Sequence, residues 1–106
     1  MLGIKKILTA IQRSFKWRST RTMHLEANPT CAACGGTKKL EVHHVVPFHT
    51  RPELELDLGN LITLCESKNN GVNCHLFFGH AGSYKSFNPA VREDAQTWKR
   101  KITERP

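Results

Sequence analysis

The sequence predicts a small α+β domain in which four cysteines staple a two-stranded hairpin and a helix flanks it at each end. Three observations lead to this fold class: apolar residues at helical spacing near both ends, two short β-rich segments in the middle, and two cysteine pairs around those segments. The chain has 106 residues, which fits one domain over residues 1–106. A core this small gains from a metal or disulfide staple.

Residues 1–25 are expected to form a basic helical extension. Cations interrupt the apolar residues, so the segment resembles neither a secretory signal nor a membrane span of about 20 residues. An acid-free amphipathic N-terminus also resembles an organelle transit peptide, but this one leads to the cysteines without an obvious cleavage region. The helix itself is expected over about residues 2–17, with Ile4, Leu8, Ile11 and Phe15 on one face.

The central segment alternates between strand and turn signals. Residues 40–46 are β-rich with alternating apolar side chains, and Pro47 ends the run. A loop is expected over residues 51–59, followed by a second short strand over residues 61–64. Residues 75–78 then begin a short helix.

A C-terminal helix is expected over residues 88–104. Asn88 is a favourable N-cap, and Pro89 suits the first helical position. The apolar residues that follow fall on one helical face, which favours a packed position for Trp98. Trp17 could pack in the core or stack on nucleic-acid bases.

The charge balance favours a polyanionic partner. Lys and Arg total 16 against 9 Asp and Glu, a formal net charge of +7, and residues 1–25 carry six cations and no acid. This points to nucleic acid first and an anionic membrane surface second, with an ordinary solvated surface as the bland alternative. The cations expected to hold phosphates without reading sequence are Arg18, Arg21, Lys38 and Lys39.

Four cysteines predict a structural zinc site. Cys31 and Cys34 form a C-x-x-C followed by two glycines, the shape of a zinc knuckle, and Cys65 and Cys74 supply a second pair with a wider gap. Two disulfides in any of three pairings, a redox pair, and free buried thiols are the alternatives. Disulfides are less favoured because no secretion signal accompanies the cysteines, and a redox pair is less favoured because the βαβ context is missing.

The histidines suggest hydrolytic chemistry. His43 and His44 close the first strand, and His75 follows the last cysteine directly. Imidazoles ligate divalent ions, and one with a pKa near neutrality can take a proton from water. His24 and His49 fit no such pattern and are expected at the surface.

Four motifs follow one another along residues 29–80, about half of the chain: Cys31-Ala-Ala-Cys34, Glu41-Val-His-His-Val-Val-Pro47, Asn60-Leu-Ile-Thr-Leu-Cys65 and Asn73-Cys-His75. In this order they resemble the HNH endonuclease family, in particular its zinc-stapled subgroup from bacteria and phages. The resemblance implies a ββα-metal finger, a hairpin and a helix that grip one divalent ion.

The resemblance also implies roles for single residues. His44 is the general base, and Asn60 braces the loop and helps to orient it. His43, where many members have Asp, and His75 are ligands of the catalytic ion, while the four cysteines hold a separate structural zinc.

Two geometric conditions follow from these roles. Neighbouring strand residues point to opposite faces, so the strand must end or bulge at His43 and His44. His80 can be a further ligand only if the helix breaks at Gly79, because five residues along a regular helix place side chains about 140° apart.

The implied function is metal-dependent hydrolysis of phosphodiester bonds in double-stranded DNA, with weak sequence preference. The catalytic ion is expected to be Mg²⁺, Mn²⁺, Ni²⁺ or Zn²⁺, and His43 in place of Asp favours the softer ions. A monomer or weak dimer in the cytoplasm of a bacterium or a phage-infected host is expected, without a membrane. The alternatives are a non-catalytic zinc module that binds nucleic acid, a phage packaging accessory protein, and a toxin or restriction nuclease of the same chemistry.

Overall fold

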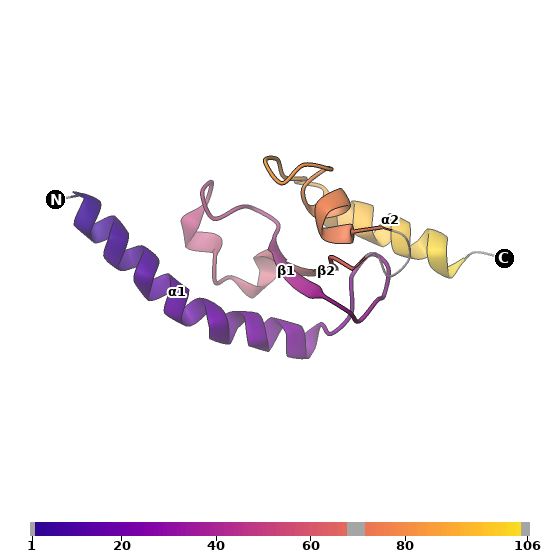
Figure 1. Cartoon of the computed structure of the whole chain (residues 1–106), viewed down its shortest axis with the longest axis horizontal. Helices are drawn as coiled ribbons and strands as arrows, with labels where there is room; N and C mark the ends of the chain where they lie inside the picture. Colours follow the sequence, from indigo (N-terminus) through magenta and orange to yellow (C-terminus); the bar gives the residue numbers. More distant parts are fainter. Residues whose placement is uncertain (1, 68–71, 105–106) are drawn as a thin grey trace.

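The computed structural model describes residues 2–67 and 72–104, with the side chains of the first helix described from Phe15 onward. Along the chain, a long helix precedes an antiparallel hairpin, and a short helical turn and a second helix follow it (Figure 1). The four main elements are α1 (Leu2–Ala27), β1 (Leu40–His44), β2 (Leu61–Cys65) and α2 (Val91–Thr103).

The hairpin is the centre of the fold. β1 and β2 pair in a register that runs from Leu40 opposite Cys65 to His44 opposite Leu61. All five residues of β2 are buried, so this strand lies in the interior. The two expected strands are therefore confirmed, although β1 ends two residues before the expected position 46.

The early end of β1 has a local cause in Asn60. The backbone carbonyl of Asn60 accepts a hydrogen bond from the N–H of Val45 (2.8 Å), and its side-chain Oδ1 accepts one from the N–H of Val46 (2.9 Å). The Asn60 side chain thus replaces the next backbone hydrogen bond between the two strands, and β1 ends there.

Helix α1 is ten residues longer than expected, since it ends at Ala27 and not near residue 17. Residues 18–27 contain neither Pro nor Gly, so nothing in them stops a helix. The stop signal is Asn28 before Pro29, because the residue before a proline is pushed out of the helical region. The expected boundary was therefore wrong, and the added turns run alongside the hairpin (Figure 1).

The core lies between β2, the turn η3 (His75–Gly79) and α2. Its buried apolar side chains include Ile62, Leu64 and Phe78, and the apolar face of α2 packs on them. That face is the expected one, with the residues Val91, Ala95, Trp98 and Ile102.

Helix α2 begins at Val91, three residues after the expected start at position 88. Asn88 still organises this end, because its Oδ1 accepts a hydrogen bond from the N–H of Ala90 (3.0 Å) and its carbonyl accepts one from Val91 (3.2 Å). The N-cap residue is Ala90, so both the expected cap and the expected helix start were wrong, and Asn88 instead forms the turn that leads into α2.

The predicted α+β fold class is confirmed, with a hairpin, flanking helices and clustered cysteines. The hairpin followed by η3 has the arrangement of a ββα-metal finger. The expected loop over residues 51–59 contains two 3₁₀ turns, Pro52–Leu54 and Leu58–Asn60. None of the helices that the structure describes is long and apolar enough to cross a membrane.

Candidate active site

The four cysteines form one buried cluster at the end of the hairpin. Their sulfur atoms all lie within 4.8 Å of one another, and Cys34 Sγ lies 3.6 Å from Cys65 Sγ. None of the four cysteines is disulfide-bonded, so the two-disulfide alternative is not what the structure contains. The cluster could hold a structural metal ion, as the spacing of the cysteines predicts.

Burial makes it difficult for these thiols to ionise together. The hydrogen bond from Cys74, helped by backbone N–H groups, lowers the pKa of Cys31 to about 4, whereas the same bond and burial raise the pKa of Cys74. Burial also raises the pKa of the Cys34 thiol. A bound cation would stabilise the thiolates of Cys34 and Cys74, whose pKa values the protein alone raises.

Three histidines form a second cluster beside the hairpin. Nδ1 of His43 lies 3.2 Å from Nε2 of His75, and Nε2 of His80 lies 3.1 Å from the same His75 atom. The three rings meet edge to face, which turns one nitrogen of each toward a common point. The structure therefore brings together the three histidines that the sequence offered as ligands.

Hydrogen bonds on the far side of the rings select the tautomers of His75 and His80. Nδ1–H of His75 donates to the Glu66 carboxylate (2.7 Å), and Nδ1–H of His80 donates to the Ser86 carbonyl (2.8 Å). Both Nε2 atoms then carry lone pairs, and these face each other at 3.1 Å. Opposed lone pairs repel unless a cation lies between them, so the arrangement fits a divalent ion.

His43 is held in its neutral form. It is 4% exposed, and burial, together with the neighbouring histidines, lowers its pKa to about 3. Gly79 packs directly against its ring, because a Cβ at position 79 would lie 3.0 Å from His43 Cε1 and 3.1 Å from Nδ1. A neutral imidazole is the form that ligates metals, and only glycine leaves room for it here.

The turn η3 explains how His80 reaches this cluster. Residues His75–Gly79 form a π-helical turn, in which the N–H of His80 bonds to the carbonyls of His75 (3.2 Å) and Leu76 (3.3 Å). The wider turn brings positions 75 and 80 onto one side, which a regular α-helix does not. The required departure from regular geometry is thus present, as a widened turn and not a break at Gly79.

His44 reaches the same pocket from the end of β1. A cavity of about 200 Å³ is lined by both strand histidines, both histidines of the η3 region, and Val42, Pro47 and Phe48. Nε2–H of His44 donates to the Glu55 carbonyl (2.9 Å), which leaves Nδ1 as the proton acceptor of the ring. The ring also packs against Trp17 of α1, with centroids 4.6 Å apart.

Asn60 lies outside this pocket and holds the loop above it. Its amide Nδ2 donates to the carbonyls of Val46 (3.0 Å) and Leu54 (3.2 Å), and the side chain is buried. These bonds tie Val46, two residues after His44, to Leu54, the neighbour of the Glu55 residue whose carbonyl holds His44. Asn60 therefore stabilises the loop and does not itself line the histidine pocket.

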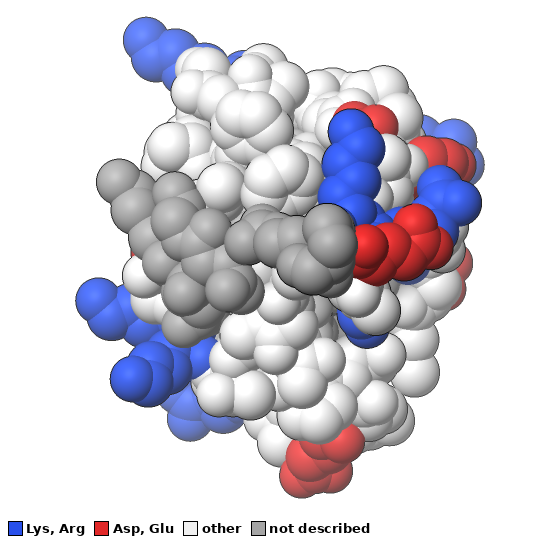
Figure 2. Space-filling model, turned by 90° about the vertical axis from the view of Figure 1, so that its right-hand side faces the viewer, with Lys and Arg blue, Asp and Glu red and all other residues white. Residues whose placement is uncertain are grey.

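The four cations expected to contact phosphates do not line the histidine pocket. The Arg21 guanidinium lies 3.7 Å from the Glu41 carboxylate and 3.5 Å from the Leu40 carbonyl, so it braces β1. Lys38 and Lys39 precede β1, at the opposite end of the strand from His44. On the face at the C-terminal end, basic and acidic atoms lie side by side over part of the surface (Figure 2).

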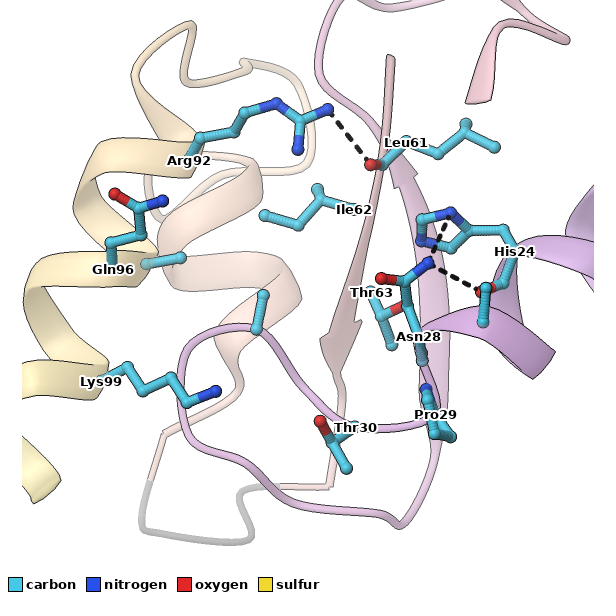
Figure 3. Close-up of a pocket in the computed structure, with 13 residues that line it drawn as sticks. His24, Asn28, Pro29, Thr30, Leu61, Ile62, Thr63, Arg92, Gln96 and Lys99 are labelled. Carbon is cyan, nitrogen blue, oxygen red and sulfur yellow. Dashed lines mark hydrogen bonds between the residues drawn. The ribbon is translucent and has the colours of Figure 1, made fainter. Parts of the chain in front are cut away.

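A second cavity, of about 390 Å³, lies between the end of α1, β2 and α2 (Figure 3). Arg92 on its α2 side donates to the carbonyls of Gly59 and Leu61, so this cation ties the helix to the hairpin. His24 on its α1 side is 7% exposed, which corrects the expected surface position. Among the described residues its Nε2 has no hydrogen-bond partner, and burial, followed by Arg92, lowers its pKa.

The site also contains contacts that sequence reasoning missed. Glu66, the Ser86 carbonyl, Gly79 and Trp17 each touch a histidine of the pocket. Adjacency to Cys65 was the one local signal for Glu66. The others act through contacts that only the folded chain brings together.

In a comparison with protein families, residues 31–75 match the model described as HNH endonuclease. The matched segment includes the four cysteines, both strand histidines, Asn60 and His75, and it stops before His80. No curated protein and no solved structure matches the chain.

Proposed function

We propose that this chain is a metal-dependent endonuclease that hydrolyses phosphodiester bonds of double-stranded DNA, because residues 31–75 match the family model described as HNH endonuclease. One observation carries the proposal: three histidines with converging nitrogens share a pocket with a fourth, His44, whose ring presents a proton acceptor. A domain of this family indicates nuclease chemistry in general. The pocket supports the finer assignment of roles.

The proposed catalytic ion is held by Nδ1 of His43 and by Nε2 of His75 and His80. Bonds of about 2.0–2.1 Å to one ion place such nitrogens about 3.0–3.4 Å apart, and the observed separations are 3.1 and 3.2 Å. The ion supplies a Lewis acid for the charge that develops on the phosphate oxygens. Three imidazoles suit Zn²⁺, Ni²⁺ or Mn²⁺ better than Mg²⁺.

His44 is proposed as the general base. Because its Nε2–H donates to the Glu55 carbonyl, the lone pair is on Nδ1, where it can take a proton from the attacking water. Water then attacks phosphorus opposite the leaving 3′ oxygen, and the products carry 5′-phosphate and 3′-hydroxyl ends. Asn60 contributes by keeping the Glu55 segment in place.

The cysteine cluster is proposed to hold a structural zinc. Four sulfurs about 2.3 Å from one tetrahedral ion lie roughly 3.8 Å apart, which matches the compact set seen here, with Cys34 and Cys65 at 3.6 Å. The ion would join the knuckle, the end of β2 and the start of η3, and so hold the hairpin to the turn that carries His75.

The wider setting is proposed from the sequence. Arg18, Arg21, Lys38 and Lys39 would contact phosphates away from the pocket and give weak sequence preference. We divide the single domain into a basic extension over residues 1–25, a nuclease core over 29–80 and a C-terminal helix. The chain would act as a monomer or weak dimer in the cytoplasm of a bacterium or phage-infected cell, with phage packaging as one setting.

Relaxation of a supercoiled plasmid tests the proposal. Zinc-loaded wild type is assayed with Mg²⁺, Mn²⁺, Ni²⁺ or Zn²⁺ beside His44→Ala. Wild type should nick the plasmid with at least one ion, and His44→Ala should be slower by ~10²- to 10⁴-fold, the usual cost of a lost general base.

His49→Ala is the matched control, because His49 is an exposed histidine that does not line the pocket. Its rate should equal that of wild type. Equal nicking rates of wild type and His44→Ala would show that His44 is not the general base. A folded wild type that binds DNA and nicks with none of the ions would favour the non-catalytic binding module instead.

A further inference from the structure

Helix α1 lies outside the residues that match the family model, yet one of its side chains touches the proposed base. The indole of Trp17 and the imidazole of His44 have centroids 4.6 Å apart, and their planes are inclined by 34°. At this distance and tilt, the two rings are in direct contact. The contact connects the N-terminal helix to the last residue of β1.

The contact is selective within the described part of α1. Phe15, two residues earlier, is 78% exposed, and Met23 is 56% exposed, whereas Trp17 is half-buried. Large apolar side chains of this helix are therefore not packed indiscriminately on the hairpin. Trp17 is the aromatic residue of the described segment that lies against the pocket wall.

The His44 ring needs such a second contact. Its hydrogen bond from Nε2 to the Glu55 carbonyl fixes one atom of the ring but leaves rotation of the ring plane about that bond. A flat indole against one face removes this freedom, because rotation would drive the imidazole into it. The direction of Nδ1 is then set by two elements, the Glu55 segment and α1.

We propose that Trp17 is a positioning residue, whose indole holds the His44 imidazole in the plane that points Nδ1 at the attacking water. The kinetic part of this inference rests on the proposed nuclease function, whereas the ring packing does not. Under this proposal α1 is part of the active site, and Trp17 is neither a plain core residue nor a platform for nucleic-acid bases.

Two variants of Trp17 separate the roles. Trp17→Leu removes the flat face, and it should lower the kcat for plasmid nicking by about 10- to 100-fold, because small misplacements of a reacting group cost this much. The KM for DNA and the Kd for Ni²⁺ at the histidine cluster should stay within about twofold. Trp17→Phe restores a flat face and should recover most of the rate.

The matched control is Phe15→Leu, which removes an exposed aromatic ring from the same helix. It should nick as wild type does. A rise in KM for Trp17→Leu with kcat unchanged would assign Trp17 to DNA binding and overturn the proposal. Equal effects of Trp17→Leu and Phe15→Leu would also overturn it.

A readout without catalysis keeps this test separate from that of the proposed function. In proton NMR spectra of the zinc-loaded wild type, the indole ring current should shift the His44 ring protons upfield, and Trp17→Phe should retain part of the shift. If wild type nicks no plasmid but the shift is present, the nuclease proposal fails and the packing stands. An unshifted His44 signal in wild type would overturn the positioning role itself, whether or not Trp17→Leu folds.

Discussion

At the scale of single residues, the histidine cluster depends on groups that lie behind its rings. Glu66 and the Ser86 carbonyl hold the protons of His75 and His80 on Nδ1, so that both Nε2 atoms face inward. Gly79 gives the His43 ring its space. The positions of the three ligand nitrogens are therefore determined by neighbouring residues that would not themselves bind the ion.

Glu66→Gln tests this dependence. Loss of the carboxylate weakens its hold on the His75 ring and lowers the basicity of Nε2, so the Kd for Ni²⁺ should rise by about 10- to 100-fold. Isothermal titration of zinc-loaded protein measures it. Glu93→Gln, which removes an exposed carboxylate from α2, should leave the Kd unchanged, and an unchanged Kd for Glu66→Gln would contradict the role of Glu66.

His24 gives a prediction on pH. Burial and Arg92 hold its pKa below the ordinary 6.5, so below that pH the unfolded chain binds more protons than the folded one. The free energy of unfolding should therefore fall as the pH drops through 6.5, and the loss should end below the folded pKa.

The measurement compares wild type with His24→Phe by urea unfolding between pH 8 and pH 5. As the pH falls, the free energy of unfolding of wild type should decrease relative to that of His24→Phe. Metal release at acidic pH affects both chains alike and cancels in this comparison. His49→Phe, at an exposed position, should show no such trend. A difference independent of pH would mean that His24 titrates normally.

At the scale of elements, the sequence predicted those features that local pattern determines. Alternating apolar residues and Pro47 identified the strands, and the C-x-x-C with its glycines identified the knuckle, because each depends on neighbours in the chain. The apolar stripe of α2 was equally local. This covers most of the fold and the identity of every histidine in the pocket.

The remaining features depend on tertiary contacts. The first strand ends at His44 because Asn60 replaces a rung of the ladder, and η3 widens into a π turn that no spacing rule predicts. The extra turns of α1 were missed because the apolar stripe ends near residue 17, whereas the helix continues until Asn28-Pro29 stops it. The partners Glu66 and Trp17 were missed because they contact the pocket only after folding.

At the scale of the whole molecule, the cysteine cluster and the histidine cluster are linked directly along the chain. Cys74 precedes the cluster member His75, and Cys65 precedes Glu66, whose carboxylate holds the His75 ring. The cysteine cluster therefore supports the segments that orient the histidine cluster. Loss of the metal at the cysteine cluster should disorder the histidine cluster, whereas loss of a histidine ligand should leave the cysteine cluster intact.

Removal of metal tests this asymmetry. A strong zinc chelator, or Cys31→Ser, should lower the melting temperature sharply and abolish Ni²⁺ binding at the histidines, because structural zinc supplies on the order of 10 kcal/mol to small domains. His80→Ala, which removes one ligand from the other cluster, should abolish nicking but change the unfolding free energy by less than about 1 kcal/mol. Circular dichroism and calorimetry follow both. A Cys31→Ser chain that melts as wild type does would contradict the structural role.

The two junctions at 65–66 and 74–75 have a consequence for the cell that makes this protein. Under the proposed function, a newly synthesised copy without zinc has no assembled cutting centre, even if catalytic ions are abundant. Binding of the structural zinc must therefore precede assembly of the catalytic site around its own ion. The newly made enzyme then cannot cut the host genome before it has bound zinc. A shortage of zinc leaves the enzyme inactive.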